Sequence, residues 1–212
     1  MRRGRRRGRF VVLEGLDGAG TTTQAARLAA RLRQAGRRVH VTAEPSGGPV
    51  GALVRQILTR RVAGAPGADG FDPAALALLF AADRLDHVAS EIAPRLAEGM
   101  DVVSDRFTLS SLAYQAVTTG DAPWVEALNA RALAPDVTLF LEVAPRTALG
   151  RRFAASATRE LFEVPALQRR VARAYAGALE RLREMGQRVE VVDGERPVEA
   201  VTDALFARVQ EL

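Results

Sequence analysis

A glycine-rich loop between an apolar strand and a helix is the feature that most constrains the fold of this chain. Residues 10–24 read FVVLEGLDGAGTTTQ, in which a short apolar run leads into three closely spaced glycines. The spacing Gly15-x-x-x-x-Gly20-x-Thr22 is the frame of a P-loop, where free backbone N–H groups and a helix N-terminus bind phosphates. The alternative is a tight strand-to-helix turn that binds no ligand. The frame predicts a phosphate site at Gly15, Leu16, Asp17, Gly18, Ala19, Gly20, Thr21, Thr22 and Thr23.

One position departs from this frame. A P-loop carries a lysine directly before its serine or threonine, and that lysine reaches the β- and γ-phosphates. Thr21 stands there instead, and the chain contains no lysine, because all 30 of its basic residues are arginines. Since Thr21 has no charge to set against the phosphates, a compensating cation must come from elsewhere in the fold.

Strand-like and helix-like segments alternate along the chain. The apolar periodicity predicts strands at 10–13, 38–42, 101–104, 137–143 and 188–192, each followed by helical patterns. This order predicts an α/β fold, with a parallel five-stranded sheet covered by helices, in one domain over residues 10–212. Ligands of such sheets bind at the carboxyl ends of the strands, where the P-loop and Asp105-Arg106 both fall.

A long helix is expected near the middle of the chain. Asp72 followed by Pro73 is typical of an N-cap and a first helical position, and the helix should run to about Ile92. Pro94 is expected to bend or end it, because proline lacks a backbone N–H.

The positive charge is concentrated at the N-terminus. The net charge is +5, and six arginines lie among the first nine residues, so the remainder is close to neutral. Residues 1–9 are therefore expected to be a basic disordered arm: either a solvated tail, or a segment that makes weak nucleic-acid or surface contacts. No specific nucleic-acid partner is expected.

Composition excludes several classes of protein. No apolar run approaches the ~18 residues of a membrane span, so no membrane partner is expected. The chain has no cysteine, which excludes disulfides and thiolate zinc sites and is compatible with a cytoplasmic location.

Five segments, taken in order and spacing, resemble thymidylate kinases. They are FVVLEGLDGAGTTTQ, the loop EPSGGPVG with Arg55 after it, LLFAADRLDHV (78–88), SDRFTLSSLAYQ (104–115) and APDVTLFLEVAP (134–145). The resemblance runs from Phe10 to the C-terminus. It implies the P-loop nucleoside monophosphate kinase fold with a lid at about 151–162, and usually a homodimer. It also implies phosphoryl transfer from ATP to dTMP with Mg²⁺, giving dTDP and ADP.

The resemblance assigns roles to individual residues. Arg106, after Asp105, would bind the acceptor phosphate and reach the transferred group, while Phe80 would stack on thymine. Thr22 would be the Mg²⁺ hydroxyl ligand. The implied acceptor set is Asp17, Glu44, Arg55, Phe80, Arg84, Arg106, Ser111 and Gln115. The implied catalytic set is Asp105, Arg106 and the lid arginines Arg151, Arg152 and Arg159.

Each residue alone has a simpler interpretation. Phe80 would be a core aromatic, Arg84 and Arg106 surface or capping residues, and Glu44 a loop carboxylate without a metal or arginine partner. Their occurrence together in one order favours the functional interpretation, because motifs gain weight from their context.

Other departures keep three functions open. Ala43 replaces an arginine that is usual before Glu44, and Phe107 replaces a usual tyrosine or histidine. The lid pattern appears as Thr158-Arg159-Glu160-Leu161, without its aspartate. The chain is then an active thymidylate kinase, a nucleotide-binding relative with little catalysis and a regulatory role, or a kinase of the same fold for another small acceptor.

Overall fold

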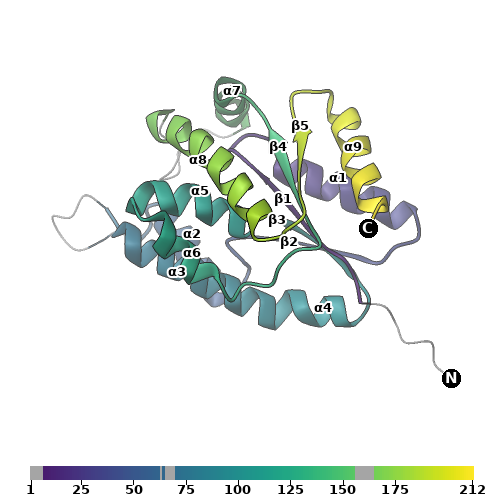
Figure 1. Cartoon of the computed structure of the whole chain (residues 1–212), viewed down its shortest axis with the longest axis horizontal. Coiled ribbons are helices and arrows are strands. Elements are labelled where there is room, and N and C mark those ends of the chain that lie inside the picture. Colours follow the sequence, from purple (N-terminus) through teal and green to yellow (C-terminus); the bar gives the residue numbers. More distant parts are fainter. Residues whose placement is uncertain (1–6, 63, 65–69, 156–164) are drawn as a thin grey trace.

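A five-stranded, fully parallel sheet forms the centre of the protein in a computed structural model (Figure 1). The structure describes residues 7–62, 64, 70–155 and 165–212. The strand order is β2-β3-β1-β4-β5. The strands are β1 (Phe10–Gly15), β2 (Val39–Ala43), β3 (Asp101–Asp105), β4 (Val137–Glu142) and β5 (Val189–Asp193). The predicted α/β fold and its five parallel strands are confirmed.

The three central strands are buried because both of their faces are covered. All six residues of β1 and all five of β3 are buried, as are the first five of β4. Their side chains are mostly branched and apolar, as is usual in a parallel sheet packed by helices on both faces. The register pairs Leu13 of β1 with Asp105 of β3, so the P-loop and the Asp105-Arg106 pair leave the sheet side by side.

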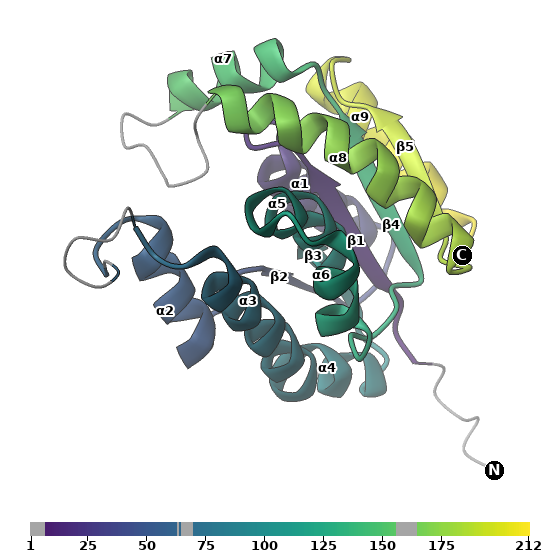
Figure 2. The ribbon, with the colours of Figure 1, turned by 60° about the vertical axis from the view of Figure 1, so that its left-hand side comes forward.

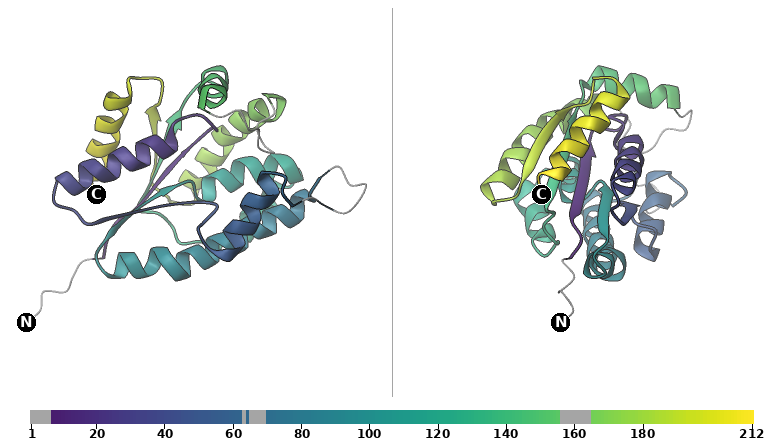
Figure 3. Two further views of the ribbon diagram at one scale, coloured as in Figure 1. Left: turned by 180° about the vertical axis from the view of Figure 1, so that it is seen from behind. Right: turned by 90° about the vertical axis from the view of Figure 1, so that its right-hand side faces the viewer.

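Helices cover the two faces of the sheet in separate groups. α1 and α9 lie on one face, and α5 and α8 lie on the other (Figure 2). Seen from behind, α1 crosses in front of the strands (Figure 3). The helices are α1 (Thr21–Gln34), α2 (Pro49–Leu58), α3 (Pro73–His87), α4 (Ala93–Ala97), α5 (Thr108–Thr119), α6 (Ala122–Asn129), α7 (Pro145–Ala155), α8 (Pro165–Glu184) and α9 (Val198–Gln210). Among the described residues, no helix is long and apolar enough to cross a membrane.

The long central helix continues past Pro94, where the sequence predicts a bend or an end. A π-helical turn, η1 (Val88–Ile92), joins α3 to α4, and the N–H of Ala93 bonds to the carbonyl of Val88, five residues back. Pro94 lies in the first turn of α4, where a missing N–H costs little. The wider π turn therefore lets the helical run pass the proline.

The last three residues of the expected arm belong to the fold. Arg7 forms an ion pair with Asp136 at 2.6 Å, and the backbone N–H of Arg9 donates to Asp101. Gly8 passes so close to Met100 that a Cβ at this position would lie 1.8 Å from the carbonyl oxygen. Residues 7–9 are thus held against the body, which corrects their expected place in a disordered arm. Residues 1–6 lie outside the described residues.

Candidate active site

The glycine loop adopts the strand, loop and helix arrangement that its spacing predicts. β1 ends at Gly15 and α1 begins at Thr21. Gly18 and Gly20 have φ values of 90° and 93°, a left-handed conformation that side chains with a Cβ rarely adopt. A Cβ on Gly18 would also lie 2.1 Å from the carbonyl oxygen of Ala148. The loop is therefore shaped for close approach of its backbone to a phosphate at the N-terminus of α1.

Thr22 and Asp105 form a pair at the first turn of α1. The Thr22 hydroxyl donates to Asp105 Oδ2 at 2.5 Å. The second carboxylate oxygen, Oδ1, is buried and has no hydrogen-bond partner among the described residues. Thr21, at the lysine position, is buried and brings no charge.

This pair fits a Mg²⁺ ion that is bound together with phosphates. Magnesium prefers oxygen ligands and is usually held by one or two carboxylates, waters and substrate phosphates. Asp105 offers an unpaired buried oxygen, and Thr22 offers a hydroxyl beside it. In the described part of the chain, no group of three or more histidine, cysteine, aspartate or glutamate side chains could hold a metal ion.

A cleft of about 540 Å³ opens over the glycine loop. It is lined by the loop residues 17–24 and by four arginines from three other segments: Arg106, Arg151, Arg152 and Arg196. Arg151 donates to the carbonyl of Gly194, which ties α7 to the loop after β5. Arg196, from that loop, is exposed and forms no ion pair with any described residue. Sequence reasoning missed Arg196, and Arg159 lies outside the described residues.

A second cavity, of about 280 Å³, lies beside the first. Its lining contains all eight residues of the implied acceptor set, which come from three loops and from α2, α3 and α5: Asp17, Glu44, Arg55, Phe80, Arg84, Arg106, Ser111 and Gln115. Leu58, Phe107, Ser110 and Tyr114 also line it. Asp17 and Arg106 face both cavities, so a group held by Arg106 would lie where the two meet.

Arg106 is held in place by several acceptors. Its φ is 73°, which is unusual for a residue with a side chain and marks strain of the kind found at functional sites. Nη2 donates to Asp17 at 2.6 Å, and Nη1 donates to the Gly15 carbonyl and to the Ser110 hydroxyl, both at 3.0 Å. Burial opposes the charge, but the Asp17 carboxylate keeps the pKa of Arg106 well above its usual value. Arg106 is thus a fixed cation and not a surface residue.

Arg84 is buried and paired with Glu44. Its Nε and Nη2 donate to one Glu44 oxygen at 3.0 and 2.7 Å, and Nη2 also donates to the Phe107 carbonyl. Nη1 donates to Asn129 and has a second N–H to offer. The simpler interpretations of Arg84 as a surface residue and of Glu44 without an arginine partner are therefore wrong. The Nδ1 of His87 lies 3.3 Å from the other Glu44 oxygen.

The other members of the acceptor set differ in their burial and in whether their polar atoms already have hydrogen-bond partners. Arg55 donates to the Pro45 and Ser46 carbonyls, so it also fixes the loop between β2 and α2. The Ser111 hydroxyl is buried and has no partner among the described residues. Phe80 is only partly buried, against the α2 and α3 side chains, and its ring also borders the cavity. An unpartnered buried hydroxyl that lines a cavity is a group prepared for a polar ligand atom.

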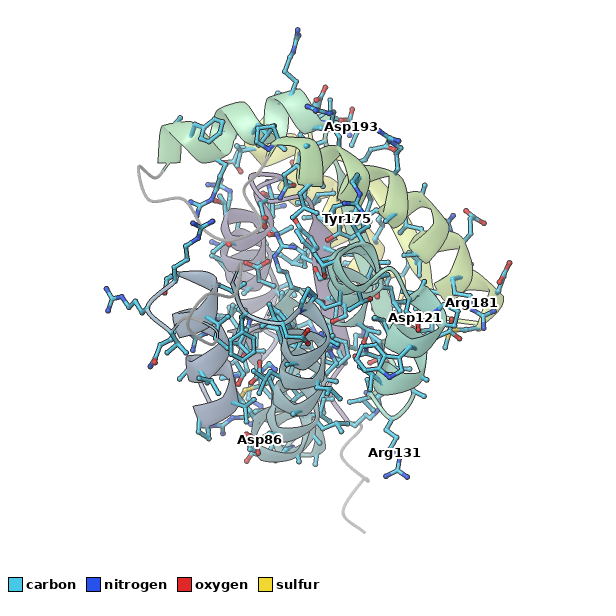
Figure 4. The ribbon with its side chains drawn as sticks, turned by 90° about the vertical axis from the view of Figure 1, so that its left-hand side faces the viewer. Asp86, Asp121, Arg131, Tyr175, Arg181 and Asp193 are labelled. Atoms are coloured by element: carbon cyan, nitrogen blue, oxygen red, sulfur yellow. The ribbon has the colours of Figure 1, made fainter. Side chains whose placement is uncertain are left out.

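Three side chains close to Arg106 were not predicted: Glu14, Ser110 and Tyr175. Glu14 is completely buried at the end of β1 and accepts hydrogen bonds from Phe107 and Ser110. Tyr175, from α8, lies in the interior, whereas the labelled Asp86 and Arg131 point outward (Figure 4). A carboxylate that interrupts the apolar run before Gly15 was the available signal for Glu14. The spacing gave no signal for Ser110, because Arg106 lies before α5 and not on it.

We predict that Thr22→Val abolishes most of the benefit that Mg²⁺ gives to ATP binding. The change removes a hydroxyl ligand and leaves Asp105 without its donor, and such losses weaken metal sites by roughly 10- to 100-fold. Calorimetric titration of ATP with and without Mg²⁺ measures the effect. Thr147→Val, at a threonine of α7 outside both cavity linings, is the matched control and should behave as wild type. An undiminished Mg²⁺ effect in Thr22→Val would exclude this metal site.

The comparisons with known proteins agree with this geometry. The family model described as thymidylate kinase matches residues 13–205. The thymidylate kinase of Thermomicrobium roseum is 43% identical over 209 residues, which cover 96% of this chain and 95% of that protein. The thymidylate kinase of Dinoroseobacter shibae is 38% identical over 205 residues, covering 95% and 96%. The probable thymidylate kinase of Thermococcus kodakarensis is 36% identical over 204 residues, covering 96% and 98%. The chain belongs to the thymidylate kinase family.

Proposed function

We propose that this protein transfers the terminal phosphoryl group of ATP to dTMP, giving dTDP and ADP. Membership of the thymidylate kinase family supports this reaction. The observation that carries it is the placement of Arg106 and Asp17 in the lining of both cavities. Phosphoryl transfer depends mainly on positioning and charge stabilisation, so one fixed cation between two nucleotide pockets is the arrangement that it needs.

The first cavity, over the glycine loop, takes ATP. The backbone N–H groups of the loop and the N-terminus of α1 hold its phosphates. Mg²⁺, held by Thr22 and Asp105, would neutralise charge on the transferred group. The arginines of α7 and of the loop after β5 replace the charge that a lysine at the position of Thr21 would bring.

The second cavity takes dTMP. Its phosphate lies at Arg106, and the base extends along the cavity toward Phe80 and Arg84. The remaining N–H of Arg84 and the unpartnered Ser111 hydroxyl can both bond to polar atoms of the base. Because Arg84 is locked by Glu44, its free N–H is presented in a fixed direction.

A site with these cations favours catalysis over mere binding. The cleft keeps four arginines, although the P-loop lacks its lysine and Ala43 replaces the usual arginine. Arg159, from the lid, is proposed as a fifth cation of this cleft. We place the enzyme in the cytoplasm, which the absence of cysteine permits.

The test of the function is a coupled assay of ADP release with dTMP, dUMP, dCMP and dGMP as acceptors. We expect dTMP to give the highest kcat/KM. Binding of ATP without ADP release from any acceptor would favour the regulatory alternative. A higher kcat/KM for another monophosphate would favour a kinase for a different acceptor.

We predict that Ser111→Ala weakens dTMP binding while stabilising the free protein. The lost hydroxyl is unsatisfied without a ligand, so its removal relieves a buried polar group, but dTMP loses a hydrogen bond worth about 0.5–1.5 kcal/mol. Calorimetry of dTMP and of ATP, together with thermal melts, measures both effects. Ser90→Ala, at an exposed hydroxyl of η1, is the control. Equal losses for ATP and dTMP would show that Ser111 is not a base contact.

We predict that the arginines carry the charge stabilisation that Thr21 lacks. Arg106→Ala should lower kcat by about 10²–10³-fold, and at least one of the alanine variants at 151, 152, 159 and 196 by about 10²-fold. KM for dTMP should change little in the latter four, because they act mainly on the transition state. Arg146→Ala, at an exposed residue of α7 outside both cavity linings, is the control. Wild-type kcat in all four, where chemistry is rate-limiting, would contradict this prediction.

We also propose that two copies associate through the outer side of α3. Leu78, Ala82, Leu85 and Ala89 are exposed at spacings of four, three and four residues, which places them on one side of the helix. Leu78 and Leu85 are 50% and 42% exposed, and exposed apolar patches of this kind mark interaction sites.

Leu85→Arg should convert the dimer to a monomer in sedimentation velocity, since a charge in an apolar interface is costly. Met185→Arg, at an exposed apolar residue after α8, is the control and should leave the dimer intact. A wild-type monomer, or a dimer that survives Leu85→Arg, would contradict the proposed interface.

A further inference from the structure

A buried carboxylate lies behind Arg106 and lines neither substrate cavity. Glu14, the residue before Gly15, has no exposed surface. Its Oε1 accepts the backbone N–H groups of Phe107 and Ser110 at 2.8 and 3.1 Å, and its Oε2 accepts the Ser110 hydroxyl at 2.5 Å. α5 has no side-chain cap of its own, so Glu14 caps it from another strand.

The Ser110 hydroxyl links this carboxylate to Arg106. It gives its hydrogen to Glu14, which leaves its lone pairs for Nη1 of Arg106 at 3.0 Å. The neighbouring Tyr175 hydroxyl donates to the Gly15 carbonyl, so its oxygen also faces Nη1 as an acceptor, at 3.4 Å. Nη1 therefore lies among three oxygen acceptors, the Gly15 carbonyl and two hydroxyls, and each hydroxyl accepts from Nη1 only while its own hydrogen points elsewhere.

We infer that Glu14 is a positioning residue, which fixes the direction of the Ser110 hydroxyl and thereby holds the Arg106 guanidinium at the junction of the two cavities. An ionised Glu14 must accept from Ser110, so the hydroxyl hydrogen points away from Arg106. Nη1 donates to the Gly15 carbonyl and the Ser110 hydroxyl, and Nη2 donates to Asp17. The Nε of Arg106 has no hydrogen-bond partner among the described residues. That N–H is available to a phosphate oxygen.

Protonation of Glu14 would loosen this hold. Its Oε1 is occupied by two N–H donors, so the proton would sit on Oε2 and point at the Ser110 oxygen. The Ser110 hydrogen would then turn toward Tyr175 and Arg106, which removes acceptor strength and the negative charge behind the guanidinium. Burial raises the pKa of Glu14 to about 7, against the opposing effects of Arg106, Ser110 and Phe107. The protonation of Glu14 therefore changes close to neutral pH.

Several other ionisable groups lie around Glu14. Arg106 keeps its charge, and the pKa values of Tyr114 and Tyr175 are raised by burial. The carboxylates nearest to this group are Asp17, which faces Arg106, and Asp105, which faces Thr22. Both histidines contact a separate group, formed by Thr42, Glu44 and Glu91.

The test compares the pH dependence of kcat in wild type, Glu14→Gln and Ser110→Ala. This comparison of kcat values relies on the proposed kinase reaction. In wild type, kcat should rise as the pH passes about 7, in addition to a step near pH 6 from the substrate phosphate. Glu14→Gln imitates the protonated state, and Ser110→Ala cuts the link to Arg106. Both should lower kcat by roughly 10- to 100-fold and lose the step near pH 7, with KM for ATP little changed.

Stability separates positioning from support of the fold. The folded pKa of Glu14 lies above its unfolded value of about 4.5, so its ionisation costs stability as the pH rises between these values. Glu14→Gln should therefore melt no lower than wild type at pH 8, although its kcat is reduced. If it does not fold, Ser110→Ala carries the test, because it keeps both N–H bonds to Glu14. Glu98→Gln and Ser90→Ala, both at exposed residues, are the controls.

A second readout is independent of turnover. The ¹⁵N–¹H signal of Arg106 Nε, assigned by its absence in Arg106→Lys, should shift with a midpoint near pH 7 in wild type and in neither variant. A wild-type pH profile of kcat or of this signal in both variants would overturn the inference. If wild type releases no ADP from any acceptor while the signal behaves as expected, the proposed reaction fails and the positioning role of Glu14 stands.

Discussion

The site depends on the ion pair between Arg106 and Asp17, which joins the end of β3 to the glycine loop after β1. Parallel pairing puts Leu13 opposite Asp105, and the N–H of Arg106 then donates to the Leu13 carbonyl. The left-handed backbone of Arg106 turns its side chain back across the end of β1. Both substrate cavities border this contact, so the sheet register determines where they meet.

A second ion pair, between Arg84 and Glu44, is buried at the second cavity. Removing Arg84 and Glu44 from water costs several kcal/mol per ion, and their attraction offsets this only because further hydrogen bonds complete both groups. Asn129, Phe107 and His87 supply those bonds. A well-packed apolar pair would often be at least as stable. We therefore interpret this ion pair as a means of presenting one arginine N–H to a ligand in a fixed direction.

Local patterns predicted the fold and the position of the glycine loop. The apolar runs placed the five strands, and the glycine spacing placed the loop before α1. The eight acceptor residues came from a family resemblance, and the sheet brings them into one cavity. Their binding roles stay predictions.

Features that arise only from tertiary contacts could not be read from the sequence. Arg196 resembles any exposed loop arginine until β5 and α9 bring it to the cleft. Glu14 looks like an interruption of a strand until α5 supplies three donors to it. The π turn that carries the helix past Pro94 contains the bond between Ala93 and Val88, and no residue type marks it. Residues 7–9 resemble the rest of a basic arm, although Gly8 fits closely against Met100.

The central claim is that one cation serves two adjacent nucleotide sites. Titration with an adenosine and a thymidine joined through a 5′-polyphosphate tests it most directly, because one such molecule should span both cavities and pass Arg106. We expect one molecule per chain, bound more tightly than either ATP or dTMP, that displaces both and loses this advantage in Arg106→Ala. Displacement of only one nucleotide, or unchanged affinity in Arg106→Ala, would contradict the account.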